Sequence, residues 1–257
     1  MPTFSLLPSV SSLYPFIDSW VEITGNEQKV FSDNFYAESD DLVWKVIANK
    51  TIGIVEVLKA DNFFQDFHGT YNVQYFGTSV TISGNALVLS VVKTGGIDFS
   101  DSVWIFQRPT INDYFDLHQQ LNETKLSSDF GSTTAISQDG NFLVASVPSN
   151  TENYLSQTGS LLLFARYNID DFFQKKDVIH GGCPYEKLGL YGVAIEANNG
   201  ALVVHAKGNG CSSNKTVRSY KLECNCKNTE HACSGFDDYP ALVCQEKVSY
   251  VSPASRI

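Results

Sequence analysis

The sequence predicts an all-β fold built from a repeated four-stranded antiparallel sheet, and three observations support this prediction. Similar stretches recur: "YFGTSVTISGNALVLSV" from Tyr75, "DFGSTTAISQDGNFLVASV" from Asp129 and "KLGLYGVAIEANNGALVV" from Lys187. The 257 residues include 17 Phe and 12 Tyr, with Val, Ile and Thr throughout, a composition that favours strands. No long stretch is rich in the residues that favour helices.

The repeat contains four elements that follow one another in order. An aromatic residue or Leu precedes a Gly, and an alternating run, a turn and a second apolar run then form a hairpin. A third apolar strand is expected at residues 53–59, 101–108, 159–166 and 216–223. A fourth, aromatic-rich strand follows three of these, with matching positions at Phe64, Phe115 and Phe173. Because alternate residues of a strand share a face, each sheet can bury a face against its neighbours.

The repeat has a period of 54 to 58 residues, measured between the Phe-Gly or Leu-Gly pairs at 76/77, 130/131 and 188/189. Four-stranded units at this period are typical of β-propellers, in which no unit is stable alone. We predict four repeats, the first of them degenerate, at residues 31–75, 76–129, 130–187 and 188–223. Residues 1–30 are predicted to supply strands of a partial blade. The fold prediction is therefore a propeller of about four blades plus a split or incomplete blade made by the termini.

The repeats resemble a known family in the "FG-x-S-V-x-I-S-G" hairpin, the "GS-x-x-x-F" third strand and the aromatic fourth strand. They are similar to the FG-GAP repeats of integrin α-subunit propellers, and more closely to FG-GAP-type repeats of secreted and surface proteins. The resemblance covers residues 31–223. The resemblance implies a propeller that acts as an interaction module.

Calcium loops are common in integrin-type FG-GAP repeats, and this sequence departs from that pattern. The corresponding turns read "SGNAL", "SQDGNFL" and "EANNGAL", each with one or two usable side-chain oxygens. Calcium needs six to eight oxygen ligands, so Asp139 and Asn141 could not form a cage unaided. We therefore expect no bound metal and no other cofactor.

The glycine that follows the aromatic residue or leucine has a predicted structural role at Gly77, Gly131 and Gly189. At these points the chain passes from the outer strand of one blade to the crowded centre of the next. A residue without Cβ permits close backbone approach and an unusual φ there. A substitution such as Gly131→Val should therefore disturb folding rather than chemistry.

All six cysteines lie beyond residue 182, at Cys183, Cys211, Cys224, Cys226, Cys233 and Cys244. An even count in turn-like sequence predicts three disulfides formed in an oxidising compartment, with fifteen pairings if all six pair. A zinc site is the alternative, but "CNC" followed by "HAC" fits paired zinc spacings poorly. From topology we pair Cys183 with Cys211, because both should lie on the same side of the last blade.

Charge and sequons indicate the surroundings of the protein. The formal net charge of −10 disfavours nucleic acids and anionic membranes as partners, since both would be repelled. No apolar run is long enough to span a bilayer, and the first residues do not form a secretory signal, so the chain is either mature or lacks its true start. Three Asn-x-Thr sequons at Asn49, Asn122 and Asn214 fall in predicted turns or loops that could carry glycans. An extracellular or cell-surface glycoprotein is expected.

We found no catalytic signature in the sequence. The five histidines share no motif, and neither G-x-S-x-G nor a P-loop is present. Adjacent acids such as Asp170 and Asp171 are interpreted as turn residues, because neighbours on a strand point to opposite faces. The leading hypothesis is a non-catalytic structural or adhesive module whose partners are other protein chains, including copies of itself in a ring or filament, with glycans as further ligands.

Two rival hypotheses and one question about the tail stay open at this stage. A carbohydrate-binding or hydrolytic propeller would use its central face, where Trp44, Trp104 and Tyr191 could stack on sugars, although core packing is an alternative use. An intracellular scaffold with free thiols is the other rival. The Cys-rich segment 224–257 would either close the ring within the chain or pair with another chain.

Overall fold

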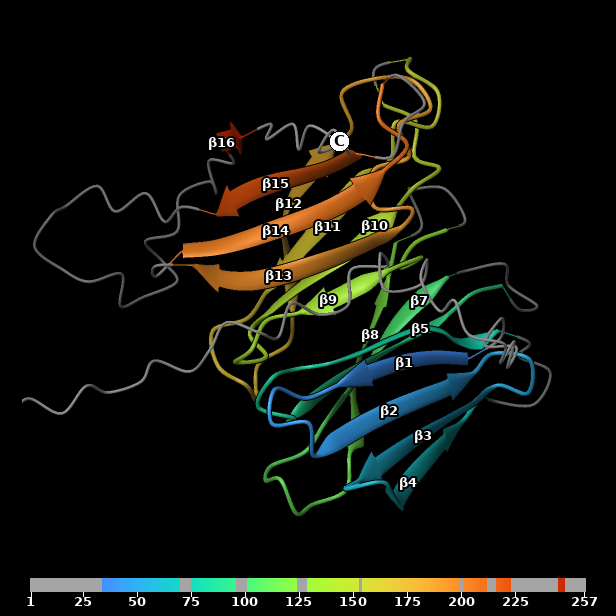
Figure 1. Ribbon diagram of the computed structural model, residues 1–257, viewed down its shortest axis with the longest axis vertical. Helices are drawn as coiled ribbons and strands as arrows, with labels where there is room; N and C mark the ends of the chain where they lie inside the picture. Colours follow the sequence, from blue (N-terminus) through green and yellow to red (C-terminus); the bar gives the residue numbers. More distant parts are fainter. Residues whose placement is uncertain are drawn as a thin grey trace, which may run out of the picture.

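The computed structural model describes residues 34–69, 75–95, 101–123, 129–152, 154–198, 201–211, 216–222 and 245–247. In these residues all regular structure is β-strand, in four antiparallel sheets of four strands arranged as the blades of a propeller (Figure 1). The predicted all-β propeller is therefore confirmed. None of the described residues forms a helix that could cross a membrane. The strands predicted within residues 1–30 lie outside the described part of the chain.

Each blade contains four strands, which neighbour one another in chain order. Blade 1 consists of β1 (Asn34–Glu38), β2 (Trp44–Asn49), β3 (Ile54–Lys59) and β4 (Asn62–His68). Blade 2 consists of β5 (Phe76–Ile82), β6 (Val88–Lys93), β7 (Ser102–Gln107) and β8 (Asp116–Asn122). Blade 3 consists of β9 (Thr134–Ile136), β10 (Phe142–Val147), β11 (Ser160–Ala165) and β12 (Gln174–His180).

Blade 4 takes its outer strand from a distant part of the sequence. It consists of β13 (Gly192–Asn198), β14 (Ala201–Gly208), β15 (Thr216–Leu222) and β16 (Gln245–Lys247). The last strand belongs to the Cys-rich tail and pairs antiparallel with β15 of the same chain, with Tyr220 opposite Glu246. Part of the tail thus completes a blade within its own chain.

The hydrophobic core is divided among the junctions between consecutive blades. One cluster joins blades 1 and 2, a second joins blades 2 and 3, and a third joins blades 3 and 4. Among the described residues no such cluster joins blade 4 to blade 1, and Figure 1 shows these two blades at opposite ends of the long axis. Blades 1 and 4 therefore each have one face that no described blade covers.

The burial of each strand follows from this arrangement. In β2 the residues that point toward blade 2, such as Trp44 and Val46, are buried, whereas Lys45 and Ile47 on the other face are half-buried. The strand β11 of blade 3 has a blade on both sides, and all six of its residues are buried. A continuous apolar run such as "SLLLFA" is the sequence pattern of a strand buried on both faces.

The three predicted structural glycines occupy equivalent positions at the start of blades 2, 3 and 4. Their φ values are +85° for Gly77, +80° for Gly131 and +80° for Gly189, in the left-handed region. Each also packs against the second and third strands of the preceding blade. A Cβ atom added to each would lie, in order, 2.8 Å from Ala48 Cβ, 2.9 Å from Val103 Cγ2 and 2.6 Å from Ser146 Cβ. Both backbone conformation and space therefore require glycine.

Candidate interaction surface

Three equivalent turns connect the third and fourth strands of blades 1, 2 and 3. We call residues 60–64, 108–116 and 166–173 the rim. Each of these rim segments contains two consecutive aromatic residues, which in blade 1 lie at the start of β4. The second of each pair packs between the blades: Phe115 and Phe173 are buried and Phe64 is half-buried. The first of each pair points outward, with exposed fractions of 64% for Phe63, 64% for Tyr114 and 62% for Phe172. The rim therefore displays one exposed ring at the equivalent position of each blade, and blade 3 also exposes Tyr167 at 51%.

Each turn of blades 2 and 3 is fixed to the preceding blade by a glutamine clasp. The Gln65 side chain on β4 accepts a hydrogen bond from Phe115 N at 2.8 Å and donates one to Phe115 O at 2.8 Å. The Gln119 side chain on β8 makes the same pair of bonds with Phe173, at 2.7 Å and 3.0 Å. The exposed rings of Tyr114 and Phe172 thus lie next to residues whose backbone N–H and C=O groups are both hydrogen-bonded to the preceding blade.

A buried arginine, Arg108, also holds the turn of blade 2. Arg108 Nε donates to Ala86 O at 2.8 Å, and its guanidinium lies 3.7 Å from the ring centroid of Trp44 and 4.4 Å from that of Phe115. Burial lowers the pKa of Arg108 to about 10, so it stays charged at neutral pH. Its charge is balanced by contact with the aromatic faces and by the nearby carboxylate of Asp113.

Arg166 holds the corresponding place in blade 3. Its Nε donates to Gly140 O at 3.1 Å, and its Nη1 donates to Gln107 Oε1 at 2.7 Å across the junction with blade 2. The guanidinium lies 4.5 Å from the ring centroid of Phe173. Burial lowers the pKa of this group also to about 10. Each arginine ties its turn to the hairpin turn of the same blade.

Acidic residues accompany the exposed rings of the rim. Asp61, Asp113, Asp116, Asp170 and Asp171 are all exposed. Some shape the turns: Asp113 accepts a hydrogen bond from Thr110 Oγ1 at 2.7 Å, and Asp171 accepts one from Asn168 N at 2.9 Å. The turn role expected for the adjacent acids is thus observed at Asp171.

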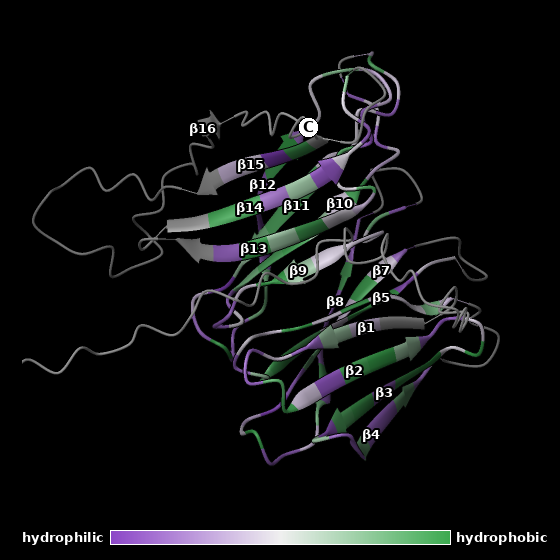
Figure 2. Cartoon of the chain, in the orientation of Figure 1, coloured by the Kyte–Doolittle hydropathy of each residue, from purple (hydrophilic) through white to green (hydrophobic). Residues whose placement is uncertain are grey.

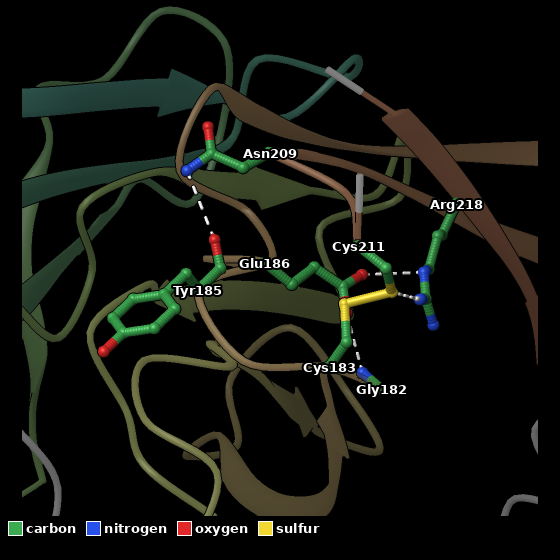
Figure 3. Close-up of a disulfide and its surroundings, with 7 residues drawn as sticks. All are labelled: Gly182, Cys183, Tyr185, Glu186, Asn209, Cys211 and Arg218. Carbon is green, nitrogen blue, oxygen red and sulfur yellow. Dashed lines mark hydrogen bonds and ion pairs between the residues drawn. A yellow bond between two sulfur atoms is a disulfide. The ribbon is translucent and has the colours of Figure 1, made fainter. Parts of the chain in front are cut away.

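The junction between blades 3 and 4 is braced by a disulfide (Figure 3). The bond joins Cys183, in the connection between these blades, to Cys211, in the loop between β14 and β15. This is the pairing expected from topology. Beside it, the fully buried Glu186 accepts a hydrogen bond from Gly182 N at 2.7 Å, and its Oε1 lies 2.7 Å from Arg218 Nε. Covalent and ionic contacts thus meet at one point.

Among the described residues, one group of side chains lies close enough together to bind a metal ion. Cys183, Glu186 and Cys211 form one group of the required closeness, but the two sulfur atoms are already bonded to each other. In the turn considered for calcium, Asp139 accepts hydrogen bonds from Ser137 Oγ at 2.5 Å and from Asn141 N and Nδ2 at 3.1 Å. The carboxylate oxygens of Asp139 therefore stabilise the turn itself.

The other predicted site residues are placed as follows. Asn49 ends β2, and its Oδ1 accepts hydrogen bonds from the backbone of Thr51 and Ile52. Asn122 ends β8 and is exposed. Asn214 and the cysteines Cys224, Cys226, Cys233 and Cys244 lie outside the described residues. Glycosylation and the remaining disulfides stay predictions.

The aromatic residues considered for sugar binding are used differently. Trp44 is completely buried at the junction of blades 1 and 2. It therefore packs in the core and cannot stack on a ligand. Trp104 packs against the same core, and its Nε1 donates to Ser102 Oγ at 3.0 Å. Tyr191 is half-buried and donates to Asn209 Oδ1 at 2.8 Å.

A polar array on blade 4 was missed by the sequence analysis. Ser219 Oγ lies 2.8 Å from His205 Nδ1, and His205 Nε2 lies 2.8 Å from Glu196 Oε1. The three residues come from β15, β14 and β13, on the face that points away from blade 3. Strand alternation was the available signal, because His205 falls between Val204 and Ala206, which face blade 3.

Comparison with known proteins shows similarity of fold alone. No protein-family model matches the sequence, and no curated protein does. A solved structure of the Myceliophteria thermophila Cps50 (Swd1) β-propeller domain is similar, with a TM-score of 0.49, 14% identity and coverage of 74% of this chain. Kuenenia stuttgartiensis hydrazine synthase (TM-score 0.46, 15% identity) and Saccharomyces cerevisiae Sqt1 (0.47, 9%) also match over 74% of this chain. The chain spans 53%, 50% and 44% of these structures, respectively.

The sheets of the described residues define the class of protein as a β-propeller, with four blades in that part of the chain. Its surface combines a rim of exposed aromatic residues with a disulfide-braced last blade. Membership of the FG-GAP family has no support from a family model and remains a hypothesis.

Proposed function

We propose that this protein is a non-catalytic interaction module that binds other protein chains through its rim. The observation that carries the proposal is the repetition of one exposed ring, to nearly the same extent, at equivalent positions of three blades. Aromatic side chains are enriched at the centres of protein interfaces and dominate their binding energy. Because the turns of blades 2 and 3 are held by glutamine clasps and buried arginines, these turns need little further ordering on binding.

The proposal includes an extracellular or cell-surface location. The oxidised pair Cys183–Cys211 supports an oxidising compartment, in which disulfides persist. Glycans on Asn49, Asn122 or Asn214, the adhesive role implied by the FG-GAP resemblance, and self-association into a ring or filament belong to the same proposal. Non-reducing mass spectrometry of the secreted protein would test both the disulfides and the glycans.

The rim is tested by measuring binding to a panel of purified extracellular domains by biolayer interferometry. The test variant is Phe63→Ser/Tyr114→Ser/Phe172→Ser, and the matched control is Tyr154→Ser, which removes a fully exposed ring outside the rim. We expect at least one partner whose affinity falls more than tenfold in the test variant and is unchanged in the control. The rim would be rejected as the binding surface if every partner bound the unchanged protein, the test variant and the control equally, or if the panel contained no partner.

Hydrolysis is a second candidate function, favoured by the Ser219–His205–Glu196 array. A serine beside an imidazole that is oriented by a carboxylate is the arrangement of a nucleophile and its base. A similar pair in blade 3, Ser160 Oγ and His180 Nδ1 at 2.9 Å, has a fully buried serine, so this cross-strand pairing also occurs as a packing element. Labelling by a fluorophosphonate probe that is lost in Ser219→Ala would establish a reactive serine and reject the non-catalytic proposal.

A further inference from the structure

We infer that the rim recognises cationic side chains, and that its partner is a basic, extended protein segment. This inference rests on the proposed function, because it takes the rim as the contact surface and adds the chemistry of the partner. It is carried by the combination of exposed rings with exposed carboxylates in the same turns.

The pairing of ring and carboxylate recurs in each blade of the rim. Asp61 precedes Phe63 by two residues, Asp113 precedes Tyr114 directly, and Asp171 precedes Phe172 directly. Asp116 and Asp170 are further exposed carboxylates of the second and third turns. An aromatic face attracts a guanidinium or ammonium group, and a carboxylate beside it adds a charge-assisted hydrogen bond. A neutral apolar partner would leave these carboxylates desolvated without compensation.

The buried side of the rim already shows this recognition within the protein. Arg108 lies against Trp44 and Phe115, and Arg166 lies against Phe173. Lys59 Nζ lies 5.1 Å from the ring centroid of Trp44. The turns thus hold cations against the inner aromatic ring, while the outer ring of each pair is exposed.

The three turns are not equivalent for an incoming cation. In blade 1, Lys45 Nζ lies 2.6 Å from Asp61 Oδ1, so this carboxylate already has a cationic partner. In blades 2 and 3 each turn has two exposed carboxylates and only one positive charge, a buried arginine that faces the core. Blades 2 and 3 therefore form the stronger part of the site. The net charge of −10 also attracts a basic partner over distance.

The geometry of the rim favours an extended segment over a compact one. The two stronger turns belong to consecutive blades, and the turn of blade 3 is held to strand β8 of blade 2, because Gln119 clasps Phe173. The second ring also lies near blade 2: the centroid of Phe172 is 5.0 Å from that of His118. Tyr114 likewise lies 5.0 Å from Phe64 of blade 1. A segment that crosses from blade to blade can place successive cations at successive turns.

The inference is tested with two synthetic peptides, one of repeated Gly-Ser-Arg units and one in which citrulline replaces every arginine. Citrulline keeps nearly the shape of arginine, but a carbonyl oxygen replaces one nitrogen of the guanidinium, so the positive charge and the N–H donors of that nitrogen are lost. Titration calorimetry with the full chain should show binding of the arginine peptide and at least tenfold weaker binding of the citrulline peptide. The affinity should also fall severalfold when salt is raised, because the contacts are partly exposed charges.

Two rim variants separate the contributions of charge and ring. One is Asp113→Asn/Asp116→Asn/Asp170→Asn/Asp171→Asn, which keeps acceptor oxygens for the turns, and the other is Tyr114→Leu/Phe172→Leu. The matched control, Glu152→Gln/Tyr154→Leu, removes a carboxylate and a ring outside the rim. We expect each rim variant to lose at least tenfold in affinity for the arginine peptide and the control to bind as the unchanged protein does. Circular dichroism verifies that all three are folded.

The outcomes distinguish this inference from the proposed function. Equal binding of both peptides, or equal binding of the arginine peptide to rim variants and control, would overturn the recognition of cations by the rim. If a rim-dependent partner emerges from the panel of extracellular domains while the arginine peptide fails, the proposed function stands and only the partner class is wrong. If rim variants affect neither partner nor peptide, both are wrong.

Discussion

The junctions between blades 1, 2 and 3 differ from the junction between blades 3 and 4 in how they are fastened. The first two use a glutamine clasp and a buried arginine. In blade 3 the register position held by Gln65 and Gln119 is occupied by Asp177, opposite Leu163. There the disulfide Cys183–Cys211 and the ion pair Glu186–Arg218 instead fix the connection that leaves blade 3 to blade 4. The same sheet can thus be fixed to its neighbour by packing and amide contacts or by a cross-link.

The outer face of blade 4 extends this comparison. His205 and Ser219 form the cross-strand pair that corresponds to Val46–Val57 in blade 1 and Val144–Leu163 in blade 3. Figure 2 shows hydrophilic stretches along β14 and β15. In blades 1 to 3 this face packs against the next blade, whereas in blade 4 it is polar. Terminal repeats of an array require such a polar face to stay soluble.

The largest expected effect concerns the ion pair of the last junction. Arg218→Met should destabilise the protein by about 3–5 kcal/mol, because the buried Glu186 carboxylate is left without its cation. The double variant Glu186→Gln/Arg218→Met should recover much of this loss. Chemical denaturation measures both, and hydrogen exchange should show faster opening in blade 4. A single variant as stable as the unchanged protein would show that the pair does not fasten the junction.

The disulfide should contribute slightly less than the ion pair to the free energy of unfolding. Replacing Cys183 and Cys211 by serine opens a loop with a sequence separation of 28 residues. The expected loss is about 3.5 kcal/mol from the restored entropy of the unfolded chain. Hydrogen exchange of the inner blades should not change in this variant. Equal acceleration in all four blades would contradict the local role assigned to the cross-link.

The glycines test what the three junctions have in common. Gly131→Ala should lower the free energy of unfolding by about 3 kcal/mol, because of backbone strain and the overlap of the added Cβ with Val103. The control is Gly95→Ala, which also has a positive φ but whose nearest side-chain atom, on Tyr75, is 3.9 Å away. It should lose only about 1–2 kcal/mol. Equal losses in thermal unfolding would show that space between blades is not the constraint.

The smallest effect is expected at the glutamine clasp. Gln119→Ala removes both partners of the Phe173 backbone and should cost about 1–2 kcal/mol. Asp177→Ala, at the same register position of blade 3, is the matched control and should cost less. Urea unfolding compares the two. If Asp177→Ala costs as much, the difference between the junctions does not lie in the clasp.

Much of the fold followed from the period of the sequence. The Phe-Gly and Leu-Gly pairs located the inner strands, and the positive φ and close packing of Gly77, Gly131 and Gly189 agree with the predicted reason for them. The partner of Cys183 followed from the position of the loops in the last blade. These features depend on neighbouring parts of one repeat, so local pattern suffices to predict them.

The candidate surface was harder to predict. The sequence matched Phe64, Phe115 and Phe173 as equivalent positions, but no role was predicted for the aromatic residue before each of them, because exposure depends on the neighbouring blade. Arg108 and Arg166 are buried although charged residues are usually exposed, and only their contacts with rings and backbone oxygens explain this. The pairing of Gln245–Lys247 with β15 could not be foreseen, because it joins segments that are far apart in the sequence.

The origin of β16 bears on the order in which the molecule can assemble. Synthesis runs from the first residue to the last, so blades 1 to 3 have all their strands while blade 4 still waits for Gln245–Lys247. At roughly 5–20 residues per second, the segment between β15 and β16 takes seconds to emerge from the ribosome. During that interval β15 is an unpaired edge and is open to pairing with the wrong chain. A nascent or truncated chain that ends before Gln245 should therefore be the form most in need of a chaperone.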